Sequence, residues 1–465
     1  MRKFLSSGYA LFLFIMALPL LMSCSEDDYL NSIPSNSSAL VSVDFRTLVS
    51  SLSESRDLEK DKNISSLLQN VLGVSDVKDC GIDFSSKAYM FETVEGNFGL
   101  VARVSDDDAL SEIFTKLQSS GICSRLETHS DCLFTVIKDY WAVGFSSRAL
   151  IVIGPVLPVQ HVEACRRISE YLKQDKSKGI TSSPLFERIS NMNGVINIVS
   201  RLSALSDNAS ALLSLGIPIN VDASQVMIAA EISSANSSCL EINSETFSLD
   251  EQIDKELKRN NKMLRENSGK YAEVLSSDAY AGLFMNFKGD KFIKLLHENS
   301  VLRTFLAGAN MAIDIDKIIK SIDGDAVVIL PDNSETNKSL IFTAQLDDKH
   351  FLDDVAYWKR SCPAGGKIAD WRKDAYCYIN GNFNYYFGVS SDMQYYSGTS
   401  KSEALSSLSK AENPLPQRVK EVIKDSRLCL VVNTDKLFAK DTSGLSFKLF
   451  QTVFGDVKYI LYTVE

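Results

Sequence analysis

The sequence predicts an α+β protein of two similar units, each a mainly antiparallel sheet covered by helices on one face. Three observations predict this fold class. Short segments alternate between apolar and polar residues, which is typical of half-buried strands. Amphipathic helical segments separate pairs of strands that are joined by short turns. The same order of segments recurs once, about 230 to 245 residues further along the chain.

The N-terminus has the pattern of a secretion signal. Arg2 and Lys3 precede an apolar run over residues 9–22, which is shorter than the roughly 20 residues of a membrane-spanning helix. The run ends in Leu-Met-Ser before Cys24, which resembles the lipobox of bacterial lipoproteins. We therefore expect residues 1–23 to be removed. The Cys24 sulfur is then expected to form a thioether with diacylglycerol, so that acyl chains such as palmitate hold the protein in a membrane.

Residues 24–35 are expected to form an acidic tether. Residues 25–28 read Ser-Glu-Asp-Asp, which is similar to the export signal that brings Bacteroidetes lipoproteins to the outer face of the outer membrane. The same run also fits a solvated spacer in a lipoprotein that faces the periplasm, because short charged runs are common in tethers. We expect an outer-membrane lipoprotein exposed at the cell surface, with the periplasmic face as the alternative.

The composition excludes some classes of partner. The chain has 465 residues, of which 45% are hydrophobic, and this is enough to build a large core. Its net charge of −10 argues against binding to nucleic acid. The four histidines are widely scattered, and none has a partner at the spacing of a zinc site on one helix. We expect no metal and no cofactor.

An internal repeat organises the chain after the tether. Cys132 lies over Cys377 at an offset of 245 residues, and Ser146 lies over Ser390 at an offset of 244. In each half an apolar segment and an aromatic segment run between these two positions. This shared order indicates a duplicated unit, although convergence of simple strand patterns would give a similar match.

The repeat sets the expected domain boundaries. The first α+β unit covers residues 36–247, and the second covers residues 276–465. Each unit opens with an alternating strand, over residues 39–45 and residues 280–287. Residues 248–275 are highly charged and are expected to form a polar connecting helix.

Each unit continues with two hairpins separated by an amphipathic helix. In the first unit the hairpins are expected to turn at residues 95–97 and 138–139, and in the second at residues 331–333 and 380–381. The helix of the first unit begins behind Asp106 and presents one apolar face, formed by Leu110, Ile113, Phe114 and Leu117. Acids repeat before the second helix, at Asp347 and Asp348, so we interpret them as helix caps rather than cation ligands.

One segment is unusually rich in aromatic residues and is the candidate binding face. Stacked aromatic side chains suit a surface for sugars or another protein, but aromatic residues are also common in ordinary strands, where alternation sends about half of them to the core. The candidate residues are Trp371, Tyr376, Tyr378, Tyr385, Tyr386, Tyr395 and Tyr396.

Two disulfides are candidates. Cys123 and Cys132 lie between the amphipathic helix and the second hairpin of the first unit, and Cys362 and Cys377 occupy the equivalent places in the second. Disulfides persist outside the cytoplasm, so the recurrence favours these two pairings. Four buried thiols are the alternative.

The start of the mature chain resembles a known family. Cys24 with its acidic spacer, Tyr29, the pair Ile33 and Pro34, and the strand over residues 39–44 resemble uncharacterised Bacteroidetes envelope lipoproteins classed as a domain of unknown function. The resemblance implies an envelope lipoprotein of this size. It brings neither an activity nor site residues with it.

Two functions remain open. The first is a non-enzymatic binding or interaction module on the cell surface, anchored through Cys24, with a glycan or an envelope protein as its partner. The sequence contains no Gly-x-Ser-x-Gly, Walker or His-Glu-x-x-His motif, which favours this function. The alternative is an envelope hydrolase whose carboxylates or serine come together only in the fold, in the cleft between the two units.

Overall fold

The computed structural model describes residues 27–47, 77–93, 95–129, 131–205, 216–218, 220–235, 238–310, 312–332, 339–440 and 444–464. The expected signal peptide and Cys24 lie outside the described residues. The chain divides into two compact units, Met1–Arg46 with Ser65–Asn191 (unit 1) and Thr47–Ile64 with Met192–Glu465 (unit 2). The boundaries expected from the repeat stay a prediction.

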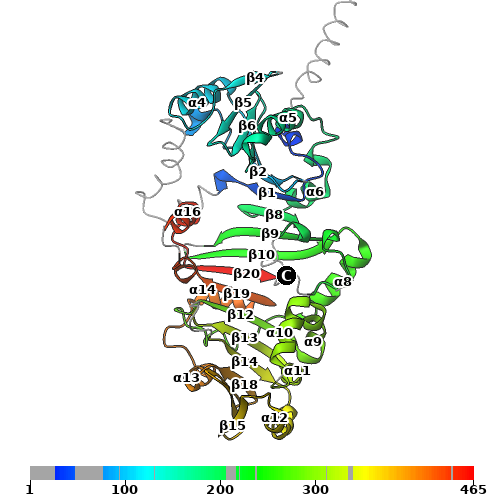
Figure 1. Cartoon of the computed structure of the whole chain (residues 1–465), viewed down its shortest axis with the longest axis vertical. Helices are drawn as coiled ribbons and strands as arrows, with labels where there is room; N and C mark the ends of the chain where they lie inside the picture. Colours follow the sequence, from blue (N-terminus) through cyan, green and yellow to red (C-terminus); the bar gives the residue numbers. More distant parts are fainter. Residues whose placement is uncertain are drawn as a thin grey trace, which may run out of the picture. The chain divides into compact units, whose positions relative to one another are not determined.

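Unit 1 contains an antiparallel sheet in which neighbouring strands follow the order β1–β2–β3–β7–β6–β5–β4 (Figure 1). The strands are β1 (Ala39–Val43), β2 (Ala88–Glu92), β3 (Phe98–Arg103), β4 (Glu127–His129), β5 (Cys132–Ile137), β6 (Trp141–Phe145) and β7 (Ala149–Gly154). The two expected hairpins are confirmed. Gly96 turns the first with φ +80°, and Lys138 and Asp139 turn the second with φ 48° and 62°.

Helices cover both faces of the unit 1 sheet, so the expectation of helices on one face is wrong. α4 (Asp107–Ser119) packs on one face, where the Phe114 and Phe145 rings stack at 5.5 Å. α5 (His161–Leu172) packs on the other face, where Ile168 lies against Gly144. The physical reason is visible in β7, which is apolar at every position and therefore buries both of its faces. The shorter helices are η2 (Asp28–Ser32), η3 (Val77–Cys80), η4 (Pro158–Gln160), η5 (Ile180–Ser182) and α6 (Pro184–Ser190).

The N-terminus of α4 confirms the capping interpretation. The Asp106 carboxylate accepts a hydrogen bond from Ala109 N at 3.0 Å, as an N-cap does. Leu110, Ile113 and Phe114 form the buried face of the helix. In unit 2, Asp348 accepts from His350 N at 2.9 Å at the start of η8 (His350–Asp354).

Unit 2 contains a mixed, mostly antiparallel sheet in the order β8–β9–β10–β20–β19–β12–β13–β14–β18–β17–β16–β15 (Figure 1). The pair β10–β20 is parallel. The strands are β8 (Ile196–Arg201), β9 (Val226–Ala235), β10 (Cys239–Ser248), β12 (Ala281–Lys288), β13 (Ile322–Leu330), β14 (Ile341–Leu346), β15 (Gly366–Arg372), β16 (Ala375–Asn380), β17 (Phe383–Val389), β18 (Gln394–Gly398), β19 (Leu428–Asn433) and β20 (Tyr459–Val464).

Seven strands of unit 2 follow the same series of pairings as the seven strands of unit 1. The order β12–β13–β14–β18–β17–β16–β15 matches β1–β2–β3–β7–β6–β5–β4 strand by strand. A helix follows the third strand in both series, α4 in unit 1 and α12 (Val355–Ser361) in unit 2. The hairpin β16–β17 turns at Gly381, with φ 58°, and Asn382, one position after the expected pair Asn380 and Gly381.

Helices also cover both faces of the unit 2 sheet. Phe287 and Phe387 belong to one buried cluster with residues of α9, α11 and α12, whereas Phe284 and Val431 belong to another with residues of α14. The helices are η6 (Leu202–Ala204), η7 (Ala223–Gln225), α8 (Glu251–Asn261), α9 (Gly289–Glu298), α10 (Ser300–Ala309), α11 (Ile315–Lys320), α13 (Lys401–Ser406), α14 (Gln417–Lys424), α15 (Thr434–Leu437) and α16 (Leu445–Phe454).

The connecting helix expected over residues 248–275 is shorter than the sequence suggests. Helix α8 ends at Asn261, and Leu264 and Arg265 then form the short strand β11 beside β12. The backbone turns again at Gly269, where φ is +81°. Leu264 and Tyr271 are both buried, which a wholly solvated helix would not allow.

Candidate functional site

Of the seven candidate aromatic residues, Tyr395 and Tyr396 are buried and the other five are half-buried. On one face of β16–β18 the hydroxyls of Tyr385 and Tyr395 meet at 2.9 Å, and the Tyr376 ring packs 5.7 Å from that of Phe387. Burial raises the pKa of both Tyr385 and Tyr395, because a phenolate would lose its hydration there. Tyr378 packs against the same cluster, as does Trp358 of α12.

The opposite face of this hairpin region is covered by α13. The Trp371 ring meets that of Tyr386 edge-on at 5.5 Å, and Tyr396 packs with Ala404. Among the aromatic residues of the segment, Phe383 is the one most open to solvent, at 52%. The structure thus gives the aromatic binding face no support, and binding by these side chains stays a prediction.

The described cysteines are free thiols, so the structure contains neither expected disulfide. The backbone of Cys123 pairs with that of Ile137 at one end of β5. Cys132 lies at the other end of β5, where its backbone pairs with that of His129. Five residues of strand separate these positions by about 16 Å, far beyond the roughly 7 Å between the Cα atoms of a disulfide. The Cys123 thiol instead donates to Phe114 O at 3.4 Å.

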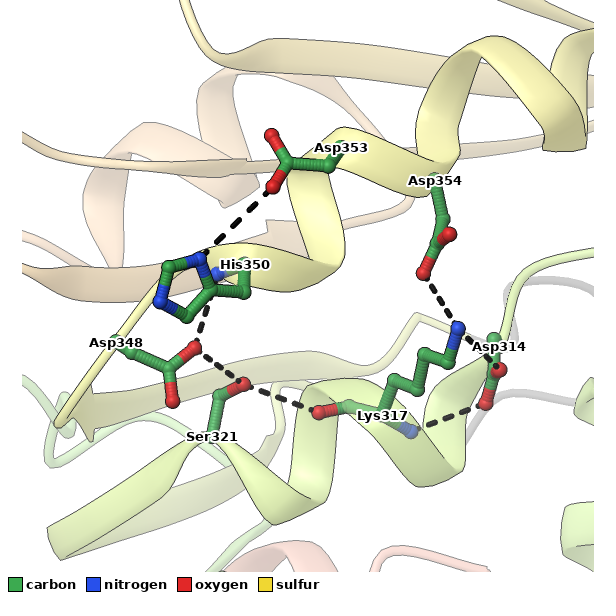
Figure 2. Close-up of polar contacts among 7 residues, drawn as sticks. All are labelled: Asp314, Lys317, Ser321, Asp348, His350, Asp353 and Asp354. Carbon is green, nitrogen blue, oxygen red and sulfur yellow. Dashed lines mark hydrogen bonds and ion pairs between the residues drawn. The ribbon is translucent and has the colours of Figure 1, made fainter.

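Polar contacts between α11 and η8 bring a serine hydroxyl close to a carboxylate (Figure 2). Ser321 Oγ lies 3.2 Å from Asp348 Oδ1 and 3.2 Å from Lys317 O. The His350 ring lies beside Asp353 instead, with its Nδ1 3.8 Å from Asp353 Oδ2, and both side chains are 87% exposed. Asp348 Oδ1 also accepts a hydrogen bond from His350 N at 2.9 Å, so this carboxylate holds the start of η8 as well as the Ser321 hydroxyl.

The same contacts join two elements of unit 2. Lys317 Nζ forms an ion pair with Asp354 Oδ2 at 2.6 Å, and Asp314 caps α11 by accepting from Lys317 N at 3.0 Å. The Asp354 partner raises the pKa of the Lys317 ammonium. These contacts tie α11 to the segment before α12, which is a structural role.

Asp325 is the most enclosed carboxylate among the described residues of unit 2, with 5% of its surface exposed. It accepts hydrogen bonds from Ser268 N at 2.9 Å, Ser268 Oγ at 2.8 Å, Lys270 N at 2.9 Å and Asn286 Nδ2 at 2.7 Å. All these donors belong to the protein, so the carboxylate fixes the loop after β11 to the sheet. Among the described residues, no group of three or more His, Cys, Asp or Glu side chains is arranged to hold a metal ion.

A group of exposed apolar side chains at one end of the unit 1 sheet is the candidate functional site. We call it the apolar rim. Its members are Phe98 (55% exposed), Tyr140 (54%), Trp141 (39%), Leu157 (59%), Val159 (90%) and Val162 (85%).

Three strand ends bring the rim together. Phe98 begins β3 and lies opposite Gly154, the last residue of β7. Trp141 begins β6 and packs over Gly154, since a Cβ added to that glycine would lie 2.4 Å from Trp141 Cε3. The chain then leaves β7 towards the start of α5. Val156 N donates to Tyr140 O at 2.8 Å, which holds this loop beside the β5–β6 turn.

The start of α5 completes the rim. His161 Nε2 lies 2.9 Å from Asp139 O, so the first turn of the helix is fixed to the same hairpin turn. Val159 and Val162 project from the loop and the first turn into solvent. Clusters of exposed apolar side chains on a folded domain mark surfaces of contact with a partner or a membrane. The sequence signal was the apolar loop at residues 154–162, Gly-Pro-Val-Leu-Pro-Val-Gln-His-Val, which we did not single out.

Comparison with known proteins identifies a family for this chain but no activity. The family described as Domain of unknown function (DUF4836) matches residues 29–435. No curated protein matches the chain. Among the described residues, no helix is both long enough and apolar enough to span a bilayer.

Solved structures of the protein TP0453 show a weak similarity. Its crystal form IV matches at 12% identity with a TM-score of 0.28, covering 44% of this chain and 75% of that chain. Crystal form I matches at 11% identity with a TM-score of 0.27, covering 44% and 73%. Scores this low support no argument about fold or function.

Proposed function

Because the chain belongs to the family described as Domain of unknown function (DUF4836), whose description names no activity, we propose its function from its own residues: a lipid-anchored envelope protein that acts as a non-enzymatic interaction module. The observation that carries the proposal is the apolar rim. Six of the exposed large apolar side chains of unit 1 belong to the rim, and their exposure has no benefit for folding.

The anchor is proposed at Cys24. The charged start, the apolar run of residues 9–22 and the small residue before Cys24 support acylation there, and residues 25–28 support export to the outer face of the outer membrane. An acyl anchor keeps a protein at a membrane without any spanning helix. We infer that the protein works at the envelope surface, where its partner is a membrane component, a glycan or another envelope protein.

Duplication is part of the proposal. The matching series of seven strand pairings in units 1 and 2 supports it, together with the offset of 245 residues between Cys132 and Cys377. Cys132 begins β5 and Cys377 lies in β16, which occupy the same place in the two series. An experimental structure in which the seven strands of one unit superpose on those of the other would support duplication, and different strand paths would contradict it.

Acylation and fractionation test the anchor. Cells expressing the full chain or Cys24→Ser are fed an alkyne-bearing palmitate, and the intact cells are then treated with protease before the membrane fraction is isolated. We expect the wild-type protein to carry the label and to be digested on intact cells, whereas Cys24→Ser carries none. Equal labelling of both proteins would contradict an anchor at Cys24.

A pull-down tests the interaction module. The mature protein is used as bait on intact envelopes and is applied in parallel to a glycan array and to immobilised envelope lipids. We expect reproducible binding to one class, which decreases for Val159→Ser/Val162→Ser and is unchanged for the exposed control Leu249→Ser. Absence of binding in all three formats would contradict the proposal.

A further inference from the structure

The apolar rim and the anchor lie on the same compact unit. η2, which begins at Asp28, is fixed in unit 1: Tyr29 and Leu30 are buried, and Tyr29 Oη donates to Lys87 O at 2.7 Å. Three Cα–Cα steps lead from Cys24 to Asp27, and they span at most about 11 Å. Unit 1 is thus held within about 11 Å of whatever membrane receives the Cys24 lipid. This step rests on the proposed anchor.

The attachment point of the tether lies at the other end of the same strands: Tyr29 of η2 binds Lys87 just before β2, whereas Phe98 of the rim pairs with Glu92 at the end of β2. η2 packs against α5, β3 and β7. Each of these three elements has one end at the rim: His161 begins α5, Phe98 begins β3, and Gly154 ends β7. Because the 12 residues of α5 form a helix about 18 Å long, the rim and η2 are separated by roughly the length of one short helix.

The side chains of the rim match the interfacial region of a bilayer. Tyr140 and Trp141 are of the two residue types that are enriched where acyl chains meet lipid headgroups. Leu157, Val159 and Val162 are aliphatic and suit the outer part of the acyl region. The acyl chains at Cys24 would hold the protein at the bilayer, and the rim can add a second contact that orients unit 1.

Charge does not drive this contact. On α5, Arg166 is paired with Glu163 and Glu170, and Arg167 lies 2.8 Å from Glu95. The whole chain carries a net charge of −10. Binding to lipid through the rim should therefore depend on apolar burial and change little with ionic strength.

We propose that the apolar rim is a membrane-docking surface that inserts into the headgroup region of the same bilayer leaflet that holds the Cys24 lipid. The docked rim fixes the orientation of unit 1 at the membrane, which a single point of attachment at Cys24 does not do. The alternative to the membrane is another protein that binds the rim.

Fluorescence quenching by brominated lipid tests the proposal. The lipidated full chain is reconstituted into phosphatidylethanolamine and phosphatidylglycerol vesicles with or without bromine on the acyl chains. We expect brominated lipid to quench Trp141 at least twofold, and Trp141→Phe to abolish this quenching. The other two tryptophans, Trp358 and Trp371, belong to unit 2, and Trp358 is 4% exposed. Their unquenched emission provides the internal baseline for the Trp141 signal.

Two variants separate docking from general effects. Val159→Ser/Val162→Ser keeps Trp141 and should reduce its quenching at least twofold, whereas Leu249→Ser, which is 63% exposed on unit 2, should leave it unchanged. The quenching should persist in high salt. Equal Trp141 emission in brominated and plain vesicles would overturn the proposal, as would quenching that appears only when another envelope protein is added.

The measured mass of the reconstituted protein shows whether Cys24 carries its lipid, so failure of the proposed anchor can be told apart from failure of docking. A protein that lacks the Cys24 lipid contradicts the anchor itself. A lipidated protein whose Trp141 is not quenched leaves the anchor in place and rejects docking by the rim.

Discussion

Tyr140 O accepts a hydrogen bond from Val156 N at 2.8 Å, so the turn between β5 and β6 and the loop after β7 form one continuous edge of unit 1. This backbone bond is independent of side-chain chemistry. The apolar side chains on the edge can therefore be changed without removing the contact that shapes it, which makes the rim accessible to mutation.

Polar substitutions in the rim should leave the fold intact. Val159 and Val162 are 90% and 85% exposed, so Val159→Ser/Val162→Ser should change the free energy of unfolding by no more than about 0.5 kcal/mol. Ile168→Ala, at a fully buried position of α5, should cost about 2–5 kcal/mol. Urea unfolding of the three proteins measures this. A large loss in the double variant would show that the rim is part of the core.

Gly154 should be required for the position of Trp141. A Cβ at residue 154 would lie 2.4 Å from Trp141 Cε3 and 2.8 Å from Tyr140 O, which the backbone cannot easily relieve. We expect Gly154→Ala to displace the indole and to cost about 1–3 kcal/mol. A changed Trp emission spectrum and a lower urea midpoint would show the effect. Wild-type emission and stability in this variant would contradict the contact.

The Asp325 carboxylate should be needed for the loop after β11. Asp325→Asn turns an amide NH₂ towards at least one of the four donors, and we expect a loss of about 2–3 kcal/mol because a buried donor is left without an acceptor. Asp353→Asn is the matched control, since Asp353 is 87% exposed and should change stability by less than about 0.5 kcal/mol. Equal stability of the two variants would reject the structural role of Asp325.

Cys429 should make stability fall at alkaline pH. Burial raises the pKa of its thiol from 9.0 to about 12. The unfolded chain loses this proton first, so the stabilisation by Cys429 is complete below pH 9 and is lost between pH 9 and about 12. Urea midpoints of wild type and Cys429→Ala should converge as pH rises from 8 to 11. A constant difference between the two would contradict the raised pKa.

Local patterns in the sequence predicted local structure well. The Lys138–Asp139 and Gly96 turns and the apolar face of α4 were readable because each depends on residues close together in the chain. The faces of the sheet were not readable in the same way. Strand β7 is apolar throughout, and such a continuous run indicates burial on both faces of the sheet. The prediction instead followed the alternating strands nearby, which indicate burial on one face.

The site was harder to predict for a physical reason. The density of aromatic residues predicted a binding face that includes Tyr385 and Tyr395, yet the hydroxyls of these two residues meet each other in the core. The rim is assembled from residues up to 64 positions apart, Phe98 and Val162, which only the pairing of β3, β7 and β6 brings together. The four donors to Asp325 likewise come from two separate segments, residues 268–270 and Asn286 of β12.

A photo-crosslinker at Val159 in living cells tests the central claim most directly. The full chain carries benzoylphenylalanine at this exposed position, with Cys24 either intact or changed to serine, and the irradiated protein is analysed by mass. We predict that the acylated chain gains the mass of one envelope lipid and that Cys24→Ser gains none. Crosslinks to a protein, or identical products with and without Cys24, would contradict an anchored unit that docks on its own membrane through the apolar rim.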